Sequence, residues 1–330
     1  MKPGRRTILR IIWALGLLVF IFLLVRIGPG RIWENISRLS FAGFALLFLL
    51  RAFYWLLRTF IWRAILAGDG RALGFGRLFV ARMAGHAVSY LTPSAYLGGE
   101  AARTFLVDGV NRKTVLASVV VDTTLEILTT ALFTLGGIAF ISIRSSLPVS
   151  SRLGLTASMI AAIAGLLFLI RSQRRGMFLG LIDILGRMGF RPRFIERNRD
   201  KIREVDARIS DFYARGPRAV GRIFALNTLL LGLWVVEVHL TLAFLGAPDL
   251  TVPKSFLAVT MGAVGLILPT TPASLGTYEA INLAVFAGLG WSAGLSMSLA
   301  LVRRSLSLFW AGFGLVAIAC RKKSGRIRRP

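Results

Sequence analysis

Two loops of similar sequence contain the residues best suited to hold a polar ligand. Residues 92–100 read TPSAYLGGE and residues 271–279 read TPASLGTYE, so the threonine, proline and glutamate align without a gap. Glycine allows close approach of the backbone, and a helix start presents free N–H groups to an anion. The candidate binding residues in and beside these loops are Pro93, Gly98, Gly99, Glu100, Arg103, Pro272, Gly276 and Glu279. We predict that the two loops together form one polar site, at which each glutamate also suits the positive end of its helix.

Two pairs of charged residues lie inside long apolar segments. Asp122 and Glu126 are one helical turn apart, and Arg303 and Arg304 occupy the apolar segment that follows the second loop. A charge inside a membrane costs about 2.5–3.5 kcal/mol on insertion scales, so such residues are expected to pair. We predict that the acidic pair meets the basic pair across the bundle, either as a static ion pair or as a gate that breaks and reforms.

Several arginines in apolar segments have no acidic neighbour that the sequence makes obvious. Arg51 lies near the middle of one such segment, and Arg82 and Arg103 flank the first loop. A guanidinium offers a two-pronged donor to phosphate, so these arginines are candidate ligands for a lipid headgroup. Arg58 lies closer to the end of its segment, and we expect its side chain to extend to the membrane surface.

Residues suited to proton transfer or catalysis are few. His86 and Glu237 are candidates either for a proton relay or for simple hydrogen bonds to their neighbours. The chain has one cysteine and two histidines, which does not suit a metal site or a disulfide framework. It has no phosphate-binding loop and no Ser-His-Asp set. We therefore expect no metal, no cofactor and no enzymatic activity.

The composition indicates a membrane protein. The chain has 41 Lys and Arg against 15 Asp and Glu, a net charge of +26, yet 55% of its residues are hydrophobic. A soluble protein of this length would have too little polar surface to cover such a core, and a nucleic-acid binder of this charge would be less apolar. Segregation reconciles the two numbers, with apolar runs in lipid and basic segments in water.

The elements that must position the candidate residues are long apolar segments and short broken ones. We predict spanning helices at 11–25, 39–66, 115–143, 153–170, 220–245 and 292–319. The segment 78–90 is only moderately apolar and precedes the first loop. The segments 255–268 and 278–289 are too short to cross and flank the second loop. The fold class expected is an all-α polytopic membrane protein, with about six spanning helices and two re-entrant broken-helix hairpins in an inverted repeat.

The placement of basic residues predicts the topology. We expect the cytoplasmic side to hold both termini, the loop 63–77 and a basic amphipathic segment at 171–219, since all are rich in Lys and Arg. The segments 246–253 and 288–292 have no Lys or Arg and are expected outside. The loops 26–38 and 144–152 carry positive charge on the outer side and are exceptions to the rule. The 330 residues then form a single transmembrane domain, with repeat units at about 78–170 and 255–319, in the plasma (inner) membrane.

The two motifs resemble those of the transmembrane family of lysylphosphatidylglycerol synthases and flippases, which includes hopanoid-associated flippase-like proteins. The resemblance covers nearly the whole chain. It depends on Pro93, the sequence Gly98-Gly99-Glu100, and Arg103 in the first half, and on Pro269, Pro272, Gly276 and Glu279 in the second. Ala273 and Ser274 stand where the family pattern has glycines. The resemblance implies a lipid-translocating half without the aminoacyl-transferase domain of the two-part members.

The favoured hypothesis is a lipid flippase or transporter, whose polar cavity takes the headgroup while the acyl chains stay in the bilayer. The expected partners are a membrane lipid (phospholipid, aminoacyl-lipid, glycolipid or hopanoid), the anionic leaflet and a possible second copy of the chain, but not nucleic acid. Two alternatives stay open. One is a membrane enzyme acting on a lipid-linked substrate, and the other is a non-transporting anchor that uses its basic segments.

Overall fold

The computed structural model describes residues 18, 20–67, 73–92, 97–107, 109–144, 149–189, 197–267 and 272–327. Within these ranges every regular element is a helix, which confirms the all-α prediction. A helical stretch at 20–27 precedes the named helices. The helices are α2 (Pro29–Ser37), α3 (Phe41–Leu66), α4 (Phe75–Leu91), α5 (Leu97–Leu106), α6 (Arg112–Arg144), α7 (Val149–Arg174), α8 (Met177–Arg187), α10 (Arg199–Ala214), α11 (Pro217–Phe244), α12 (Val252–Ile267), the 3₁₀ turn η2 (Pro272–Ser274), α13 (Thr277–Gly288) and α14 (Ala293–Ile327).

Four of these helices are long and apolar enough to cross a membrane. They lie at Phe41–Leu66, Arg112–Gly137, Pro217–Phe244 and Ala293–Cys320. Large apolar side chains on them face outward, among them Leu49, Phe53, Leu308, Phe309 and Val316, each more than half exposed. Such surfaces are rare on soluble monomers and are typical of a lipid-facing helix.

These four helices correspond to four of the six predicted spans. The predicted span 11–25 falls largely outside the described residues. The predicted span 153–170 is helical within α7, but many side chains of α7 also lie outside what the structure describes. The side of the membrane on which each end lies stays a prediction, as do the inverted repeat and the re-entry of the loops.

The chain divides into two compact units. Unit 1 comprises Met1–Leu56, Phe79–Arg103 and Gly232–Pro330, and unit 2 comprises Leu57–Leu78 and Thr104–Leu231. This division differs from the predicted repeat, because the segment 78–170 is shared between the units whereas 255–319 lies wholly in unit 1. The two candidate loops therefore belong to the same unit.

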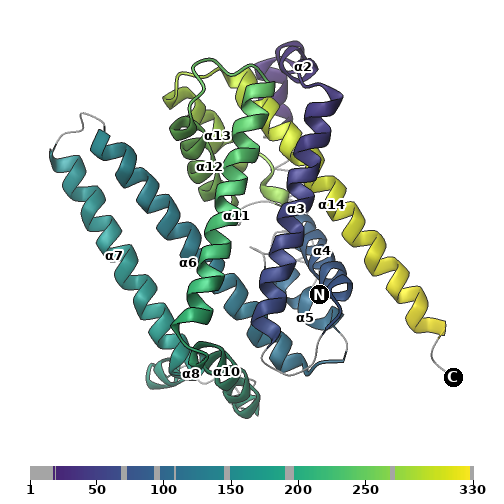
Figure 1. Ribbon diagram of the computed structural model, residues 1–330, viewed down its shortest axis with the longest axis vertical. Coiled ribbons are helices and arrows are strands. Elements are labelled where there is room, and N and C mark those ends of the chain that lie inside the picture. Colours follow the sequence, from purple (N-terminus) through teal and green to yellow (C-terminus); the bar gives the residue numbers. More distant parts are fainter. Residues whose placement is uncertain are drawn as a thin grey trace. The chain divides into compact units, whose positions relative to one another are not determined.

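Unit 1 is built around α14 and two short helical hairpins. α14 packs against α2 and α13, and α13 packs against α12 (Figure 1). α5, α12 and α13 have 10, 16 and 12 residues. At 1.5 Å per residue, each spans less than the roughly 30 Å of a hydrocarbon core. Short helices thus flank the two proline- and glycine-containing loops, and the re-entry of these hairpins stays a prediction.

Glycines let α4 approach its neighbours closely. A β-carbon on Gly99 of α5 would collide with the Gly85 carbonyl oxygen and the Ser89 hydroxyl, both of α4. A β-carbon on Gly314 of α14 would collide with the Met83 carbonyl group of α4. The close approach that we predicted for Gly99 is therefore made by protein backbone, which gives this glycine a role in helix packing.

The Gly314 contact leads to a first prediction. Gly314→Ala should lower the free energy of unfolding by about 1–3 kcal/mol, because α14 must move away from α4 to admit the methyl group. Gly312→Ala is the matched control, since nothing lies within 4 Å of a β-carbon there, and its effect should stay within about 0.5 kcal/mol. Thermal unfolding in detergent measures both variants. Equal melting temperatures for the two would contradict the packing that we describe.

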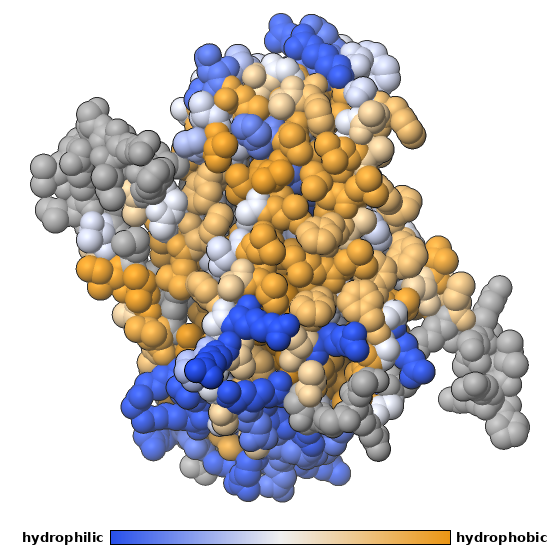
Figure 2. Space-filling model, in the orientation of Figure 1, coloured by the Kyte–Doolittle hydropathy of each residue, from blue (hydrophilic) through white to orange (hydrophobic). Residues whose placement is uncertain are grey.

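Unit 2 contains α8 and α10, two helices of the described part of the basic segment 171–219. α6 and α7 lie side by side, and α8 and α10 pack against α7 (Figure 1). Both Asp206 carboxylate oxygens accept backbone hydrogen bonds from the start of α8, at Phe178 (3.2 Å) and Leu179 (2.8 Å). Hydrophilic residues gather over α8 and α10, whereas the surfaces of the long helices are largely hydrophobic (Figure 2).

α10 is held by a buried hydrogen-bonded chain and by an ionic cluster. Tyr213 donates to Gln173 (2.5 Å), and Gln173 donates to Thr124 of α6 (2.7 Å). Burial raises the pKa of Tyr213 to about 12. Hydrogen bonds from Lys113 and Arg208 hold the pKa of Glu204 below its ordinary value. The basic segment is thus a folded part of unit 2 with defined partners.

Candidate functional site

Unit 1 gathers nearly all the residues that the sequence singles out. Its members among them are Arg51, Arg82, His86, Gly98, Gly99, Glu100, Arg103, Glu237, Gly276, Glu279, Arg303 and Arg304. Asp122 and Glu126 belong to unit 2. Pro93 lies outside the described residues, and so does the side chain of Pro272.

Glu279 and Arg304 form the centre of the site. The Glu279 side chain is 1% exposed and accepts a hydrogen bond from the backbone N–H of Gly276 (2.8 Å), so it caps the start of α13. Its other carboxylate oxygen accepts from Arg304 Nε (2.6 Å) and lies 2.5 Å from Arg304 Nη2. Capping and ion pairing therefore coincide on one carboxylate, which is fully removed from solvent.

The backbone of the second loop is shaped around the same arginine. Ala273 and Ser274 have φ values of 52° and 49°, in the left-handed region that favours glycine. These are the two positions at which the sequence departs from the glycines of the family pattern. The carbonyl oxygens of both residues accept from the Arg304 guanidinium, at 3.1 and 3.5 Å. The loop thus keeps a glycine-like conformation, and Arg304 satisfies the carbonyls that it turns inward.

Arg303, the neighbour of Arg304, contacts aromatic residues. Its Nη1 donates to the Tyr278 hydroxyl (2.9 Å), and its guanidinium lies 4.9 Å from the centre of the Trp234 ring. A cation over an indole face is stabilised by the ring quadrupole. The two adjacent arginines therefore differ in partners: Arg304 is paired with a carboxylate, whereas Arg303 is held by a hydroxyl and a ring.

The end of α4, just before the first loop, extends this site. The Tyr90 side chain is hydrogen-bonded to Arg304 and lies near enough to Glu279 to interact with its charge. The His86 ring lies 5.7 Å from the Tyr90 ring and 4.6 Å from that of Trp55 on α3. We call Arg51, Glu237, His86, Tyr90, Glu279, Arg303 and Arg304 the polar network of unit 1. It connects the helix before the first loop with the second loop itself.

Arg51 and Glu237 form the second ion pair of the network. Both side chains are largely buried, at 12% and 4% exposed, and Arg51 donates to the Glu237 carboxylate. Arg51, for which the sequence shows no obvious acidic neighbour, therefore has one in the fold. Glu237 lies 186 residues further along the chain on α11, so only the fold places it opposite Arg51.

The first motif contributes its charged residues differently. Glu100 is half-buried, and Arg103 is 7% exposed. The stem of Arg103 runs along α4 so closely that a β-carbon on Gly85 would lie 2.5 Å from its Cγ atom. The two loops of the repeat are thus not equivalent in detail: the glycines of the first close a helix contact, whereas the second turns its carbonyls to Arg304.

The predicted pairing of Asp122 and Glu126 with Arg303 and Arg304 is replaced by other partners. In unit 2, Arg58 bridges Asp122 (3.8 Å) and Glu126 and also donates to Asn227 (3.0 Å). Arg58 is 4% exposed, so the expectation that it extends to the membrane surface is wrong. The physical reason is that a fully buried carboxylate such as Asp122 needs a cation, and α3 supplies one.

Three residues of the site escaped the sequence reasoning, namely Tyr90, Tyr278 and Trp234. Tyr278 directly precedes Glu279 in the second motif, Tyr90 lies two residues before Thr92 of the first motif, and Trp234 occupies an apolar segment. Position in or beside a motif is the signal that could have found the tyrosines. Within the described residues, no group of three or more His, Cys, Asp or Glu side chains lies close enough to hold a metal ion.

Comparison with known proteins assigns the chain to a family. The family described as the lysylphosphatidylglycerol synthase TM region matches residues 9–314. None of the curated proteins with which the chain was compared matches it. The match includes all four helices that can span a membrane, up to residue 314, and both loop motifs. The chain is an integral membrane protein that belongs to the lysylphosphatidylglycerol synthase transmembrane family.

Proposed function

We propose that the protein moves a lipid with an anionic, phosphate-bearing headgroup between the leaflets of the plasma (inner) membrane, and that it is a transporter and not an enzyme. The observation that carries the proposal is the Arg304 site, where one buried guanidinium binds Glu279, two loop carbonyls and Tyr90. Membership of a lipid-related family supports the same function. Charges retained at such depth are costly unless they serve a ligand or a partner.

The chemistry of exchange supports a headgroup that competes for arginine. A phosphate is a two-pronged acceptor with the same geometry as a carboxylate, so it can take the place of Glu279 on Arg304. When the lipid leaves, the ion pair reforms and no buried charge is left alone. Arg51 and Glu237 offer a second pair of the same kind, which allows a headgroup to pass from one arginine to the next.

The lipid tails need no protein path in this proposal. The outward faces of α3 and α14 are apolar, so acyl chains can stay in the bilayer while only the headgroup enters unit 1. Phospholipids, and aminoacyl-lipids, glycolipids or hopanoids whose polar head carries a phosphate, fit this description. Contact of α8 and α10 with the anionic cytoplasmic leaflet, and cytoplasmic termini, belong to the same proposal.

Translocation by the purified protein tests the proposal. The protein is reconstituted into liposomes that contain fluorescently labelled phosphatidylglycerol. An added reductant quenches the label in the outer leaflet, so the loss of fluorescence measures how much lipid has reached that leaflet. We expect the protein to accelerate exchange of the label between leaflets. Tyr90→Phe removes only the hydroxyl that is hydrogen-bonded to Arg304. This change should slow exchange about tenfold, the equivalent of one charge-assisted hydrogen bond. Thr228→Val is the matched control, because the Thr228 hydroxyl bonds only to the Phe224 carbonyl (3.0 Å) in its own helix.

Two outcomes would count against this function. Wild-type exchange rates in both Tyr90→Phe and Glu279→Gln would remove the polar network from the transport path. Chemical conversion of a labelled lipid by the purified protein, with no exchange between leaflets, would support the membrane-enzyme alternative.

A further inference from the structure

A polar cavity lies in unit 1, and its lining contains no residue of the polar network. It has a volume of about 600 Å³, within the range of small-molecule sites. Its charged and polar lining comes from Arg26, Arg31, Glu34, Asn35 and Ser292, and Leu23, Ile27 and Leu283 form an apolar wall. The lining thus combines cations and hydrogen-bond donors with an apolar side, which suits a lipid headgroup joined to its hydrocarbon part.

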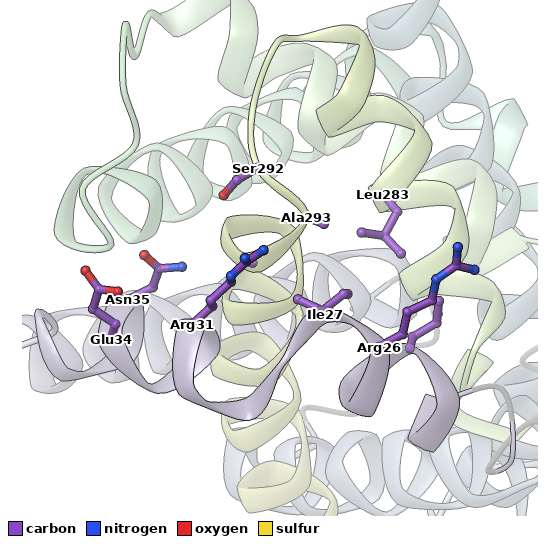
Figure 3. A pocket seen from close by; sticks show the side chains of 10 residues that line it. Arg26, Ile27, Arg31, Glu34, Asn35, Leu283, Ser292 and Ala293 are labelled. Carbon is purple, nitrogen blue, oxygen red and sulfur yellow. The ribbon is translucent and has the colours of Figure 1, made fainter.

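The two arginines of the cavity have no acidic partner among the described residues. Arg26 lies over the Phe22 ring (5.7 Å) on its own helix, and Arg31 is exposed. Glu34 also lines the cavity, but its carboxylate is paired with Arg38 (3.1 Å). In Figure 3, Arg31 points toward the chain at Ser292 and Ala293, and Arg26 lies on the Leu283 side. The net charge that faces the cavity is therefore positive.

The start of α14 adds donors to the cavity. Ser292 accepts from the Leu295 N–H (3.2 Å) and caps this helix, whose first residues Ala293 and Gly294 line the cavity. The first N–H groups of a helix have no partner within it and attract anions. Gly294 keeps this end open, because a β-carbon there would already contact Asn35 Nδ2 at 3.4 Å.

The cavity is one helical turn from the polar network. On α13, Glu279 binds Arg304 and Leu283 lines the cavity, and residues four apart lie on the same face of a helix. Phe20, on the same helical stretch as Arg26, lies under Arg304 with 5.5 Å between its ring centre and the guanidinium carbon. Ile32 and Tyr278 belong to one apolar cluster. The arginines of the cavity thus lie close along the chain to residues that contact Arg304.

We propose that this cavity binds the phosphate group of an anionic lipid through Arg26 and Arg31, as a docking site next to the translocation network. This inference rests on the proposed function only for its place on the path, because binding itself needs no transport. It also accounts for the positive charge of the loop 26–38, which the predicted topology puts on the outer side. In this proposal Arg26 and Arg31 bind an anion, and the charge rule for loops does not describe them.

Equilibrium binding to the full-length protein tests this site. Native mass spectrometry in detergent counts bound dioleoylphosphatidylglycerol and, in a parallel titration, dioleoylphosphatidylcholine. We expect phosphatidylglycerol to bind more tightly, and Arg31→Gln and Arg26→Gln each to weaken it about tenfold. Lys254→Gln is the matched control, since Lys254 belongs to unit 1 but stacks on Trp291 outside the cavity (5.6 Å). Glu34→Gln should tighten binding severalfold, an effect that misfolding would not produce.

Two competition arms identify the source of the phosphate. If millimolar glycerol phosphate or inorganic phosphate displaces the lipid, the cavity reads the phosphate alone. If only diacyl lipid binds, the wall at Leu23, Ile27 and Leu283 contributes to recognition. Equal affinity of the wild type, Arg26→Gln and Arg31→Gln for phosphatidylglycerol would overturn the inference. A wild-type protein that binds phosphatidylglycerol through Arg26 and Arg31 but does not exchange it between leaflets would instead count against the proposed function.

Discussion

Replacing Arg304 by alanine is expected to lower the free energy of unfolding by about 3–5 kcal/mol, the cost of breaking a buried ion pair by removing one partner. Glu279 would stay buried at 1% exposure without its cation. The carbonyls of Ala273 and Ser274, both in left-handed conformations, would lose their donor as well. Equilibrium unfolding in mixed detergent micelles measures the change.

Three comparisons make this result specific. Arg303→Ala changes the adjacent arginine, which is paired with no carboxylate among the described residues, and should cost about 1–2 kcal/mol. Arg304→Lys should recover only part of the loss, because an ammonium cannot reproduce the fork that meets Glu279 and the loop together. Arg304→Met with Glu279→Leu removes both charges and should be more stable than Arg304→Ala. An Arg304→Ala protein as stable as the wild type would mean that the pair does not hold the second loop.

Arg58→Ala is expected to destabilise unit 2 by a similar amount, about 3–5 kcal/mol. Asp122 is 0% exposed and lies 3.8 Å from Arg58, and Asn227 would lose a 3.0 Å hydrogen bond. The same change should not alter lipid binding to the cavity of unit 1. Unfolding in detergent, together with the phosphatidylglycerol titration, separates the two effects.

Arg63→Ala provides the matched control for Arg58. It removes an arginine from the same helix, but Arg63 is exposed, so the effect should stay within about 0.5 kcal/mol. Asp122→Asn in the Arg58→Ala background should restore part of the stability, because the uncompensated charge is then gone. Failure of this second substitution to help would show that Asp122 does not depend on Arg58 for its charge.

Features that depend on local sequence were predictable. The apolar runs found the four helices that can span a membrane, and proline and glycine marked where α4 gives way to α5 and α12 to α13. Glu279 follows Gly276 by three residues, a spacing that predicts a capping carboxylate, and the structure confirms it. The backbone preferences of proline and glycine and the hydropathy of a segment depend on a few neighbouring residues. A single sequence therefore shows where apolar helices begin and break.

The choice of ionic partners was not predictable in the same way. The repeat suggested that Asp122 and Glu126 meet Arg303 and Arg304, because it places an acidic pair and a basic pair in corresponding helices. The fold instead pairs Arg58 with Asp122, Arg51 with Glu237 and Arg304 with Glu279. Each buried charge takes the opposite charge that helix packing brings within reach, and a distance in sequence does not encode that contact.

The sequence alone thus established an all-helical membrane protein, its two proline-broken loops and the list of buried charges that must find partners. The tertiary structure settled which charges neutralise each other, that Gly99 closes a helix contact, and that Arg26 and Arg31 share a cavity with the start of α14. Hydropathy and turn chemistry are local properties of the chain. Ion pairs and cavities depend on how helices that are distant in sequence pack together, so only the packed structure shows which residues form them.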